Sequence, residues 1–389
     1  MQEKLISKKK PSFPISKKLS TYLTQYSRNV LMPVFYDDLL RYSGSVEVFD
    51  KTGADTLWIR VYYKEYERDE IDLSLKKIYT ILHADGSDGS LPYLNVDAID
   101  YCTFGNSKPF RIKIRNVLND NYMYMYIKRA DASRVYGLEI EHLLSPDRIN
   151  FLVHKDTLVE EHIQGIPGDV FMSEGYEDFS SRDQKQLAKE FVKFNERCLL
   201  RLLGDMRSYN YVIVPTHDFD QVQFRIRAID FDQQSYEGRV KVYMPQFLKE
   251  NGKFVEMVHN NLREESIQQY KIEERSAISK RIIRVQDRIN FLLECMSEDE
   301  ISSEEKVKRL RKDLFDYTKD KRFKTCKNMG AILRVAFDFV VRNYENVNHY
   351  VIHWVEKKWG QTNFYAQKNG LGMGLVAVKI DVVQTFHIS

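Results

Sequence analysis

The sequence predicts an α+β protein built in two lobes. Segments in which apolar residues alternate with polar ones occur mainly in the first half of the chain. From about residue 245 to residue 345 the apolar spacing is helical and the composition is heavily charged. This order, strands with a helix first and then a mostly helical region interrupted by one hairpin, predicts an α+β plan in two lobes. Hydrophobic residues make up 43% of the 389 residues and aromatic residues 13%, which excludes a chain that is disordered throughout.

The first 95 residues or so predict a small α/β region that follows a basic tail. Residues 1–17 are rich in lysine and show no sustained periodicity, so we expect them to be disordered. Short helices are expected between residues 19 and 42. "GSVEVFD" and "DTLWIRVYYKEY" are typical of strands, with a turn between them. "EIDLSLKKIYTILHADG" predicts a helix that ends near Gly86, and the loop "DGSDGSLP" after it is a candidate domain boundary.

The middle of the chain predicts a strand pair, a helix and two more strands. "FRIKIRN" and "NYMYMYIKRA" form the pair, with a turn at residues 118–121. "YGLEIEHLLS" predicts the helix, and "INFLVHK" and "TLVEEHI" predict the next strands. "GIPGDVFM" reads as a loop that opens a short helix.

A long amphipathic helix is predicted at residues 181–203, with Ser180 or Ser181 as its N-cap. "YNYVIVP" and "VQFRIRAIDF" then predict a hairpin that turns at "THDFDQ". The end of the chain, "LVAVKIDVVQTF", predicts a strand. "NGLGMGL" just before it holds three glycines, but no clear strand precedes it and no capped helix follows, so we expect a loop there.

The charge distribution argues against a nucleic-acid-binding body. Six lysines and one acidic residue give the first 20 residues a net charge of +5, so the other 369 carry −2 of the chain's total of +3. We therefore expect no strong nucleic-acid signal, although the basic tail could meet an acidic partner. No apolar run is long enough to span a membrane, and no apolar segment follows the N-terminal lysines as in a secretory signal. Four scattered cysteines without CxxC spacing favour a reducing, cytoplasmic location.

Three segments together carry the residue types that phosphoryl transfer from ATP requires. "GDMRSYN" places Asp205 and Asn210 five residues apart after the long helix. "AIDFD" places Asp230 after an apolar strand, and Lys128 ends a strand far upstream. A lysine can bind phosphates, one aspartate can receive the proton of an attacking hydroxyl, and an asparagine with a second aspartate can hold Mg²⁺. Taken singly, each has a plainer explanation, a helix-ending turn for Asp205 and an exposed strand end for Lys128.

These motifs resemble the protein-kinase-like superfamily, and most closely its aminoglycoside/choline-kinase branch. The similar segments are Leu203-Gly204-Asp205 with Asn210, Ile229-Asp230-Phe231-Asp232, and "LVEEHIQGIPG" at residues 158–168. The layout "FGNSKPFRIKI…YMYIKRAD…YGLEIEHLL" is also similar to serine kinases of the HipA type. The resemblance covers roughly residues 100–240. It implies a bilobal kinase-like fold that uses ATP and Mg²⁺.

The resemblance also implies a role for each matching residue. Lys128 would bind the ATP phosphates and pair with Glu139 or Glu141, an alternative that the sequence leaves open. Asp205 would be the catalytic base, and Arg207 would contact phosphate. The metal ligands would be Asn210, Asp230 and Asp232. The remaining nucleotide contacts would come from Gly105 and Ser107 in a glycine-poor turn and from Glu161, His162 and Ile163, whose backbone would meet adenine.

Two departures from the family pattern leave the function open. Leu203 stands where the branch has a histidine, and "TFGNSK" offers a single glycine to cover the nucleotide. A phosphotransferase acting on a hydroxyl is the first hypothesis, with a protein Ser/Thr slightly favoured over a small molecule because large extensions suit macromolecular partners. A nucleotide-binding pseudokinase or AMP-transferring protein is the second. A non-enzymatic adaptor that works through its helical C-terminal region is the third.

The expected organisation has five parts: a disordered basic tail at 1–18, an N-terminal α/β extension at 19–95, a small kinase-like lobe at 96–162, a large kinase-like lobe at 163–300, and a mostly helical C-terminal extension at 301–389.

Overall fold

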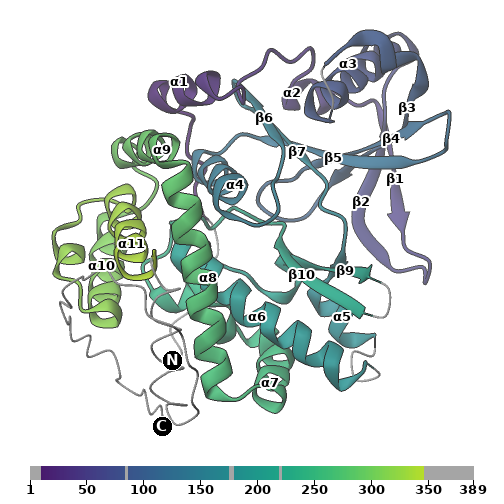
Figure 1. Cartoon of the computed structure of the whole chain (residues 1–389). Coiled ribbons are helices and arrows are strands. Elements are labelled where there is room, and N and C mark those ends of the chain that lie inside the picture. Colours follow the sequence, from purple (N-terminus) through teal and green to yellow (C-terminus); the bar gives the residue numbers. More distant parts are fainter. Residues whose placement is uncertain (1–9, 84–85, 175–178, 219–220, 346–389) are drawn as a thin grey trace, which may run out of the picture. The chain divides into compact units, whose positions relative to one another are not determined.

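A seven-stranded antiparallel sheet forms the first part of the protein, which is described by a computed structural model (Figure 1). The structure describes residues 10–83, 86–174, 179–218 and 221–345. The strand order is β1-β2-β3-β4-β5-β7-β6. The strands are β1 Gly44–Phe49, β2 Asp55–Tyr62, β3 Leu94–Cys102, β4 Phe110–Asn116, β5 Tyr122–Arg129, β6 Phe151–His154 and β7 Thr157–Glu161.

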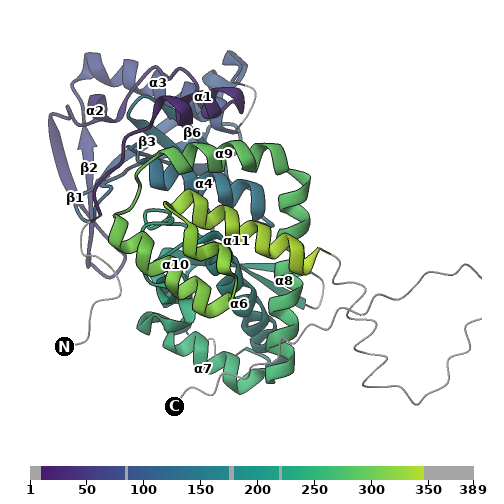
Figure 2. The ribbon, with the colours of Figure 1, turned by 90° about the vertical axis from the view of Figure 1, so that its left-hand side faces the viewer.

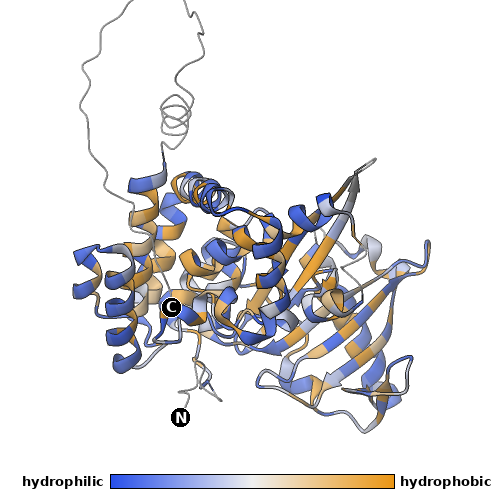
Figure 3. Ribbon diagram, turned by 90° about the horizontal axis from the view of Figure 1, so that it is seen from below, coloured by the Kyte–Doolittle hydropathy of each residue, from blue (hydrophilic) through white to orange (hydrophobic). Residues whose placement is uncertain are grey.

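Apolar residues alternate along the strands and place one face of the sheet on a core (Figure 3). Helices α2 (Tyr36–Leu39) and α3 (Glu65–His83) contribute to this core, where Leu75 and Ile78 of α3 are fully buried with Ile99 and Ile112 of the sheet. Strand β3 was not predicted. Its pairing with β4 shifts register between Val96 and Ala98, which interrupts the two-residue alternation by which a strand is recognised.

The opposite face of the sheet carries the first site residue. Tyr126 of β5 lies opposite Glu160 of β7, and Lys128 lies opposite Leu158. Since side chains on a strand alternate between faces, Tyr126, Lys128 and Glu160 share one face. The strand pairing thus sets Glu160 beside Lys128 before any side-chain interaction is considered.

Helix α4 (Ala132–Leu144) follows β5 and is buried along almost its whole length. Asp131 is its N-cap, accepting a hydrogen bond from the Arg134 backbone N–H. At Gly137 an added Cβ would lie 3.1 Å from Phe231, so the absence of a side chain lets the helix approach the segment that follows β10.

Helices dominate the second part, as predicted. Helix α6 (Ser181–Arg201) is capped by Ser180, and a three-stranded sheet of order β10-β9-β8 lies beside it. The other elements here are β8 Ile166–Pro167, β9 Tyr211–Asp218, β10 Gln221–Ala228, α5 Gly168–Ser173, α7 Gly252–Asn261, α8 Glu264–Arg284, α9 Gln286–Glu298, α10 Glu304–Thr318 and α11 Met329–Tyr344. Helices α8, α9 and α11 pack against one another (Figure 2).

The disordered tail predicted for residues 1–18 extends too far toward the C-terminus. Helix α1 (Lys17–Gln25) already begins at Lys17, capped by Ser16. Before it, Lys10 and Phe13 make hydrogen bonds to Asp131 at the start of α4. The strand predicted from "LVAVKIDVVQTF" lies outside the described residues.

All described residues belong to one compact unit. Its sheet-rich part and its helical part are compatible with the kinase-like fold that the sequence predicts. The domain boundaries within this unit stay predictions. In the part of the chain that the structure describes, no helix is both long and apolar enough to cross a membrane.

We expect Gly330→Ala to destabilise the protein at the contact between α11 and α9. A Cβ at Gly330 would lie 2.5 Å from the Ser297 backbone nitrogen, which cannot move without shifting α9. This overpacking should cost about 1–3 kcal/mol of unfolding free energy, measured by urea denaturation. Gly252→Ala at the start of α7 is the matched control, because no atom lies within 4 Å of its added Cβ. Equal stability of the two variants would contradict the assigned α9–α11 contact.

Candidate functional site

Arg134, in the first turn of α4, joins four charged side chains from three other elements. Its guanidinium contacts Glu160 of β7 at 3.1 Å, Asp230 at 2.7 Å and Asp232 at 2.7 Å. Glu160 also accepts a hydrogen bond from Lys128 Nζ at 2.7 Å. The Arg134 side chain is only 3% exposed. The arginine therefore brings Lys128, Asp230 and Asp232, which the sequence places far apart, into one cluster.

The expected pairing of Lys128 with Glu139 or Glu141 is wrong, because Glu160 is the partner of Lys128. Both glutamates belong to α4 but point elsewhere. Glu139 is fully buried and binds Arg288 of α9, with Arg28 and the Tyr22 hydroxyl nearby. Glu141 pairs with Arg201 at the end of α6. We infer that these two acids fasten α4 to its neighbours and do not reach the cluster around Arg134.

The carboxylates of the cluster differ in their pKa values. Loss of solvation raises the pKa of Asp230, and the neighbouring Asp232 raises it further. Burial also opposes ionisation of Asp232 and Glu160, but nearby cations outweigh it. Arg134, then Lys128, holds the pKa of Asp232 below its ordinary value, while Lys128, then Arg134, does so for Glu160. Asp232 and Glu160 are thus ionised at neutral pH, and Asp230 is the carboxylate whose charge is least favoured.

Asp205 lies in a short loop that an unusual backbone conformation shapes. Helix α6 ends at Leu202 in the left-handed region (φ 53°), and Asp205 has a φ of 59°. Only a few residue types, aspartate and asparagine among them, adopt this conformation readily. Leu203 stands where the aminoglycoside/choline-kinase branch has histidine. It is buried, and its backbone forms an isolated antiparallel β-bridge with Gln234. Leu203 therefore packs as part of the core.

Asn210 and Asp205 are held together by the same loop. The Asn210 side-chain amide donates to the Asp205 carbonyl at 2.7 Å, and the Asn210 carbonyl accepts from the Ile229 N–H at 3.0 Å. The second bond ties the loop to the end of β10, immediately before Asp230. Because the side-chain nitrogen of Asn210 donates to the Asp205 carbonyl, the side-chain oxygen of Asn210 can bind a ligand.

The environment of Asp205 suits a proton acceptor. Burial is the largest effect and raises the pKa of Asp205 to about 6, although Arg207 lowers it; Asp230 and Glu250 add to the rise. Arg207 Nε donates to Asp205 Oδ1 at 2.6 Å, and its Nη1 contacts Glu250 at 3.1 Å. A carboxylate with a pKa near 6 is ionised at neutral pH and still accepts a proton efficiently.

The oxygen donors near Asp230 fit a hard divalent cation. Asn210, Asp230 and Asp232 supply amide and carboxylate oxygens, the ligands that Mg²⁺ prefers. Among the described residues, no three His, Cys, Asp or Glu side chains form a cluster that could hold a metal. Mg²⁺ commonly takes only one or two carboxylates and completes its shell with water and substrate phosphates. The residues present therefore fit a cation that arrives with a phosphorylated ligand.

The remaining predicted residues lie at two places around the sheet. Glu161, His162 and Ile163 directly follow Glu160 at the end of β7. The N–H groups of Glu161 and His162 donate to the carbonyls of Asn150 and Tyr124. Gly105 (φ 85°) and Ser107 lie in the loop between β3 and β4, the position from which a hairpin could cover a ligand. Among the described residues, the side-chain hydrogen bonds of Arg134 go to Glu160, Asp230 and Asp232, and none goes to this loop.

Sequence reasoning missed Glu160 and Arg134. A signal for Glu160 was present, since an acid in the buried strand "TLVEE" requires a cationic partner. Arg134 had no comparable signal, because an arginine on a helix is most often exposed.

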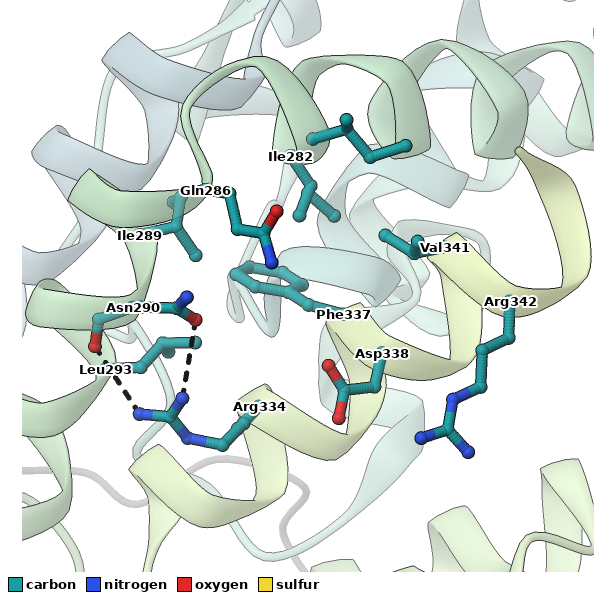
Figure 4. A pocket seen from close by; sticks show the side chains of 11 residues that line it. Ile282, Gln286, Ile289, Asn290, Leu293, Arg334, Phe337, Asp338, Val341 and Arg342 are labelled. Carbon is teal, nitrogen blue, oxygen red and sulfur yellow. Dashed lines mark hydrogen bonds between the residues drawn. The ribbon is translucent and has the colours of Figure 1, made fainter.

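A cavity of about 120 Å³ between α8, α9 and α11 is separate from these residues (Figure 4). Apolar side chains including Ile289 and Phe337 line it, and Arg334 at its edge bonds to Asn290. None of the predicted site residues is among those that line it.

We expect Glu139→Gln to lower the unfolding free energy by about 3–5 kcal/mol, because it leaves Arg288 and Arg28 without their buried carboxylate. Urea denaturation with an unchanged m-value would measure this loss. Glu298→Gln is the control: it removes a carboxylate that is 62% exposed and pairs with Lys18, so we expect a change below about 1 kcal/mol. A loss for Glu139→Gln no larger than that of the control would contradict the fastening role.

The chain was compared with family models, with curated proteins and with solved structures. No protein-family model matches the chain, and no curated protein matches it. A crystal structure described as a kinase domain is similar over 72% of this chain and 99% of its own, with 12% sequence identity and a TM-score of 0.23. A TM-score this low does not establish a shared fold, so the assignment below depends on the site itself.

Proposed function

We propose that this protein is a kinase-like phosphotransferase that transfers the γ-phosphoryl group of ATP to a hydroxyl. One observation carries the proposal: Arg134 links the Lys128–Glu160 pair to Asp230 and Asp232 in a single cluster. The order of these residues along the chain is the order that the kinase resemblance requires. The hydrogen bond from the Ile229 N–H to the Asn210 carbonyl, one residue before Asp230, supports including the Asp205 loop in the same site.

Within this proposal each residue has a chemical task. Lys128, oriented by Glu160, binds phosphate oxygens as a point charge. Arg134 offsets the repulsion among Glu160, Asp230 and Asp232. A bound Mg²⁺ would supply positive charge that offsets the negative charge developing on the phosphate. Asp230, Asp232 and the amide oxygen of Asn210 would hold it, with Arg134 contacting the Oδ1 oxygen of each carboxylate.

Asp205 acts on the acceptor. As the hydroxyl oxygen forms its bond to the γ-phosphorus, the Asp205 carboxylate takes up the hydroxyl proton and ADP leaves. Arg207 keeps Asp205 in place through its 2.6 Å hydrogen bond and would contact phosphate. Adenine would meet the backbone near Ile163, since Glu161 and His162 donate their N–H groups within the protein. A protein Ser/Thr remains the slightly favoured acceptor.

A second candidate, a nucleotide-binding pseudokinase or AMP-transferring protein, also has an observation in its favour. Arg134 already engages both carboxylates proposed as metal ligands, and such an engagement could replace the metal. Incubation with ATP and Mg²⁺ followed by mass spectrometry separates the candidates. A phosphate adduct supports the phosphotransferase, an AMP adduct supports AMP transfer, and nucleotide binding without any product supports the pseudokinase.

The third hypothesis, an adaptor, predicts that nucleotide does not bind. A ligand present at 100 times its dissociation constant stabilises the folded state by about 2.7 kcal/mol. Millimolar ATP with Mg²⁺ should therefore raise the melting temperature measurably if our proposal is correct. An unchanged melting temperature would favour the adaptor.

We expect Asp205→Asn to lower the ATP turnover rate by about 10²–10⁴-fold while leaving nucleotide affinity within about twofold, because only proton transfer is lost. Steady-state turnover and calorimetric binding would measure the two effects. Asp338→Asn, which removes a carboxylate that is 53% exposed, is the control and should leave turnover unchanged. Turnover by Asp205→Asn at the unaltered rate would exclude this residue as the base.

The pH dependence of turnover should report the pKa of Asp205. We expect kcat/KM to fall as the pH drops through about 6, because the protonated carboxyl cannot accept a proton. Arg207→Ala removes the cation that lowers this pKa, so the fall in kcat/KM should occur at a higher pH than in the unaltered protein. If the fall occurs at the same pH in Arg207→Ala, the group that causes it is not Asp205.

A further inference from the structure

The basic N-terminal region contributes a buried lysine beside the proposed site. Lys10 Nζ binds Asp131 Oδ2 at 2.5 Å, and the Lys10 side chain is only 6% exposed. The ammonium also lies 5.1 Å from the centre of the Phe13 ring and 5.8 Å from that of Tyr236. A lysine of a merely solvated tail would not be enclosed in this way. We call residues 10–16 the strap.

The strap completes the N-terminal end of α4. The first backbone N–H groups of a helix have no partner within it. The Phe13 carbonyl accepts from the Ala132 N–H at 2.8 Å, while the Phe13 N–H donates to Asp131 Oδ1 at 2.7 Å. Asp131 in turn accepts from the Arg134 N–H at 3.2 Å. Two of the otherwise unpaired donors are thus satisfied by the strap or by the aspartate that the strap holds.

The turn of α4 that the strap completes is the one that faces the site. Arg134 contacts the carboxylates of the cluster from this turn, and Ser133 Oγ donates to the Gln234 carbonyl at 2.8 Å. Phe13 also lies 6.1 Å from the ring of Tyr236, two residues beyond Gln234. The strap therefore touches both the helix that carries Arg134 and the segment that follows Asp232.

We propose that Lys10 is a positioning residue for the nucleotide site, acting through Asp131 on the first turn of α4 and hence on Arg134 and Asp232. The inference rests on the proposed function, because nucleotide is the ligand whose affinity it concerns. It assigns the N-terminal strap a role within its own chain, in contrast to the acidic partner that the charge of the tail suggested.

The other end of the strap has a separate anchor, which allows a clean test. Ser16 Oγ bonds to Asp299 at 3.3 Å, and Tyr136 of α4 bonds to the same carboxylate at 2.6 Å. Lys18 pairs with Glu298 at 2.5 Å. Loss of the Lys10 contact should therefore loosen residues near Asp131 without releasing α1.

The experiment compares the full-length chain with Lys10→Met, Lys10→Arg and Lys18→Met, using a non-hydrolysable ATP analogue with Mg²⁺. For Lys10→Met we expect about a tenfold weaker affinity, the size of effect that losing one charged hydrogen bond produces. Amide exchange in the first turn of α4 should also become faster. Lys10→Arg should recover most of the affinity, and Lys18→Met should stay within about twofold of the unaltered chain. In turnover assays the KM for ATP should rise, with kcat unchanged.

A second variant covers the case in which Lys10→Met fails to fold. Lys10→Met/Asp131→Asn removes the charge at both ends, and asparagine remains a good N-cap, so α4 keeps its start. The same loss of affinity is expected, because the strap contact is lost in both.

The outcomes separate this inference from the proposed function. If the unaltered chain binds the analogue and Lys10→Met binds it equally well or more tightly, the positioning role is overturned and the phosphotransferase stands. If the unaltered chain binds no nucleotide, the proposed function falls and the positioning role falls with it. Equal loss in Lys10→Met and Lys18→Met would show a general effect of N-terminal charge and would also overturn the role.

Discussion

The burial of charged groups on α4 is the constraint on which the rest of the structure depends. A helix with Arg134, Glu139 and Glu141 inside the protein is tolerable only if each charge meets an opposite one. Each of them reaches a different element: the sheet and the segment after β10 for Arg134, α9 for Glu139, and α6 for Glu141. The helix thereby sets how the sheet-rich part meets the helical part.

This arrangement makes the site and the scaffold parts of one electrostatic system. The carboxylates that could hold a metal are also the counter-ions of Arg134, and Glu160, which orients Lys128, is another. A cation or phosphate that binds in the cluster therefore either competes with the contacts between Arg134 of α4 and these carboxylates or adds new contacts to them. Ligand binding and the stability of α4 should be thermodynamically coupled for this reason.

Much of the fold was predictable because it rests on local patterns. The long helix α6 and its Ser180 cap, the hairpin β9–β10 and the strand pair β4–β5 followed from periodicity and capping residues. Strand β3 did not, because its bulge breaks the alternation. In the site, the loop from Asp205 to Asn210 was recognisable as a motif. The partner of Lys128 was not, because it depends on which strands are neighbours, and spacing along the chain does not contain that information.

The left-handed backbone at Asp205 has a consequence for which residues this position can accept. Its φ of 59° is costly for most side chains, by about 1–2 kcal/mol, and is tolerated by aspartate, asparagine and glycine. An alanine there would combine a chemical loss with strain in the loop, so its effect could not be assigned to chemistry alone. The backbone conformation therefore limits this position to a few residue types. Of aspartate, asparagine and glycine, only aspartate carries a charge.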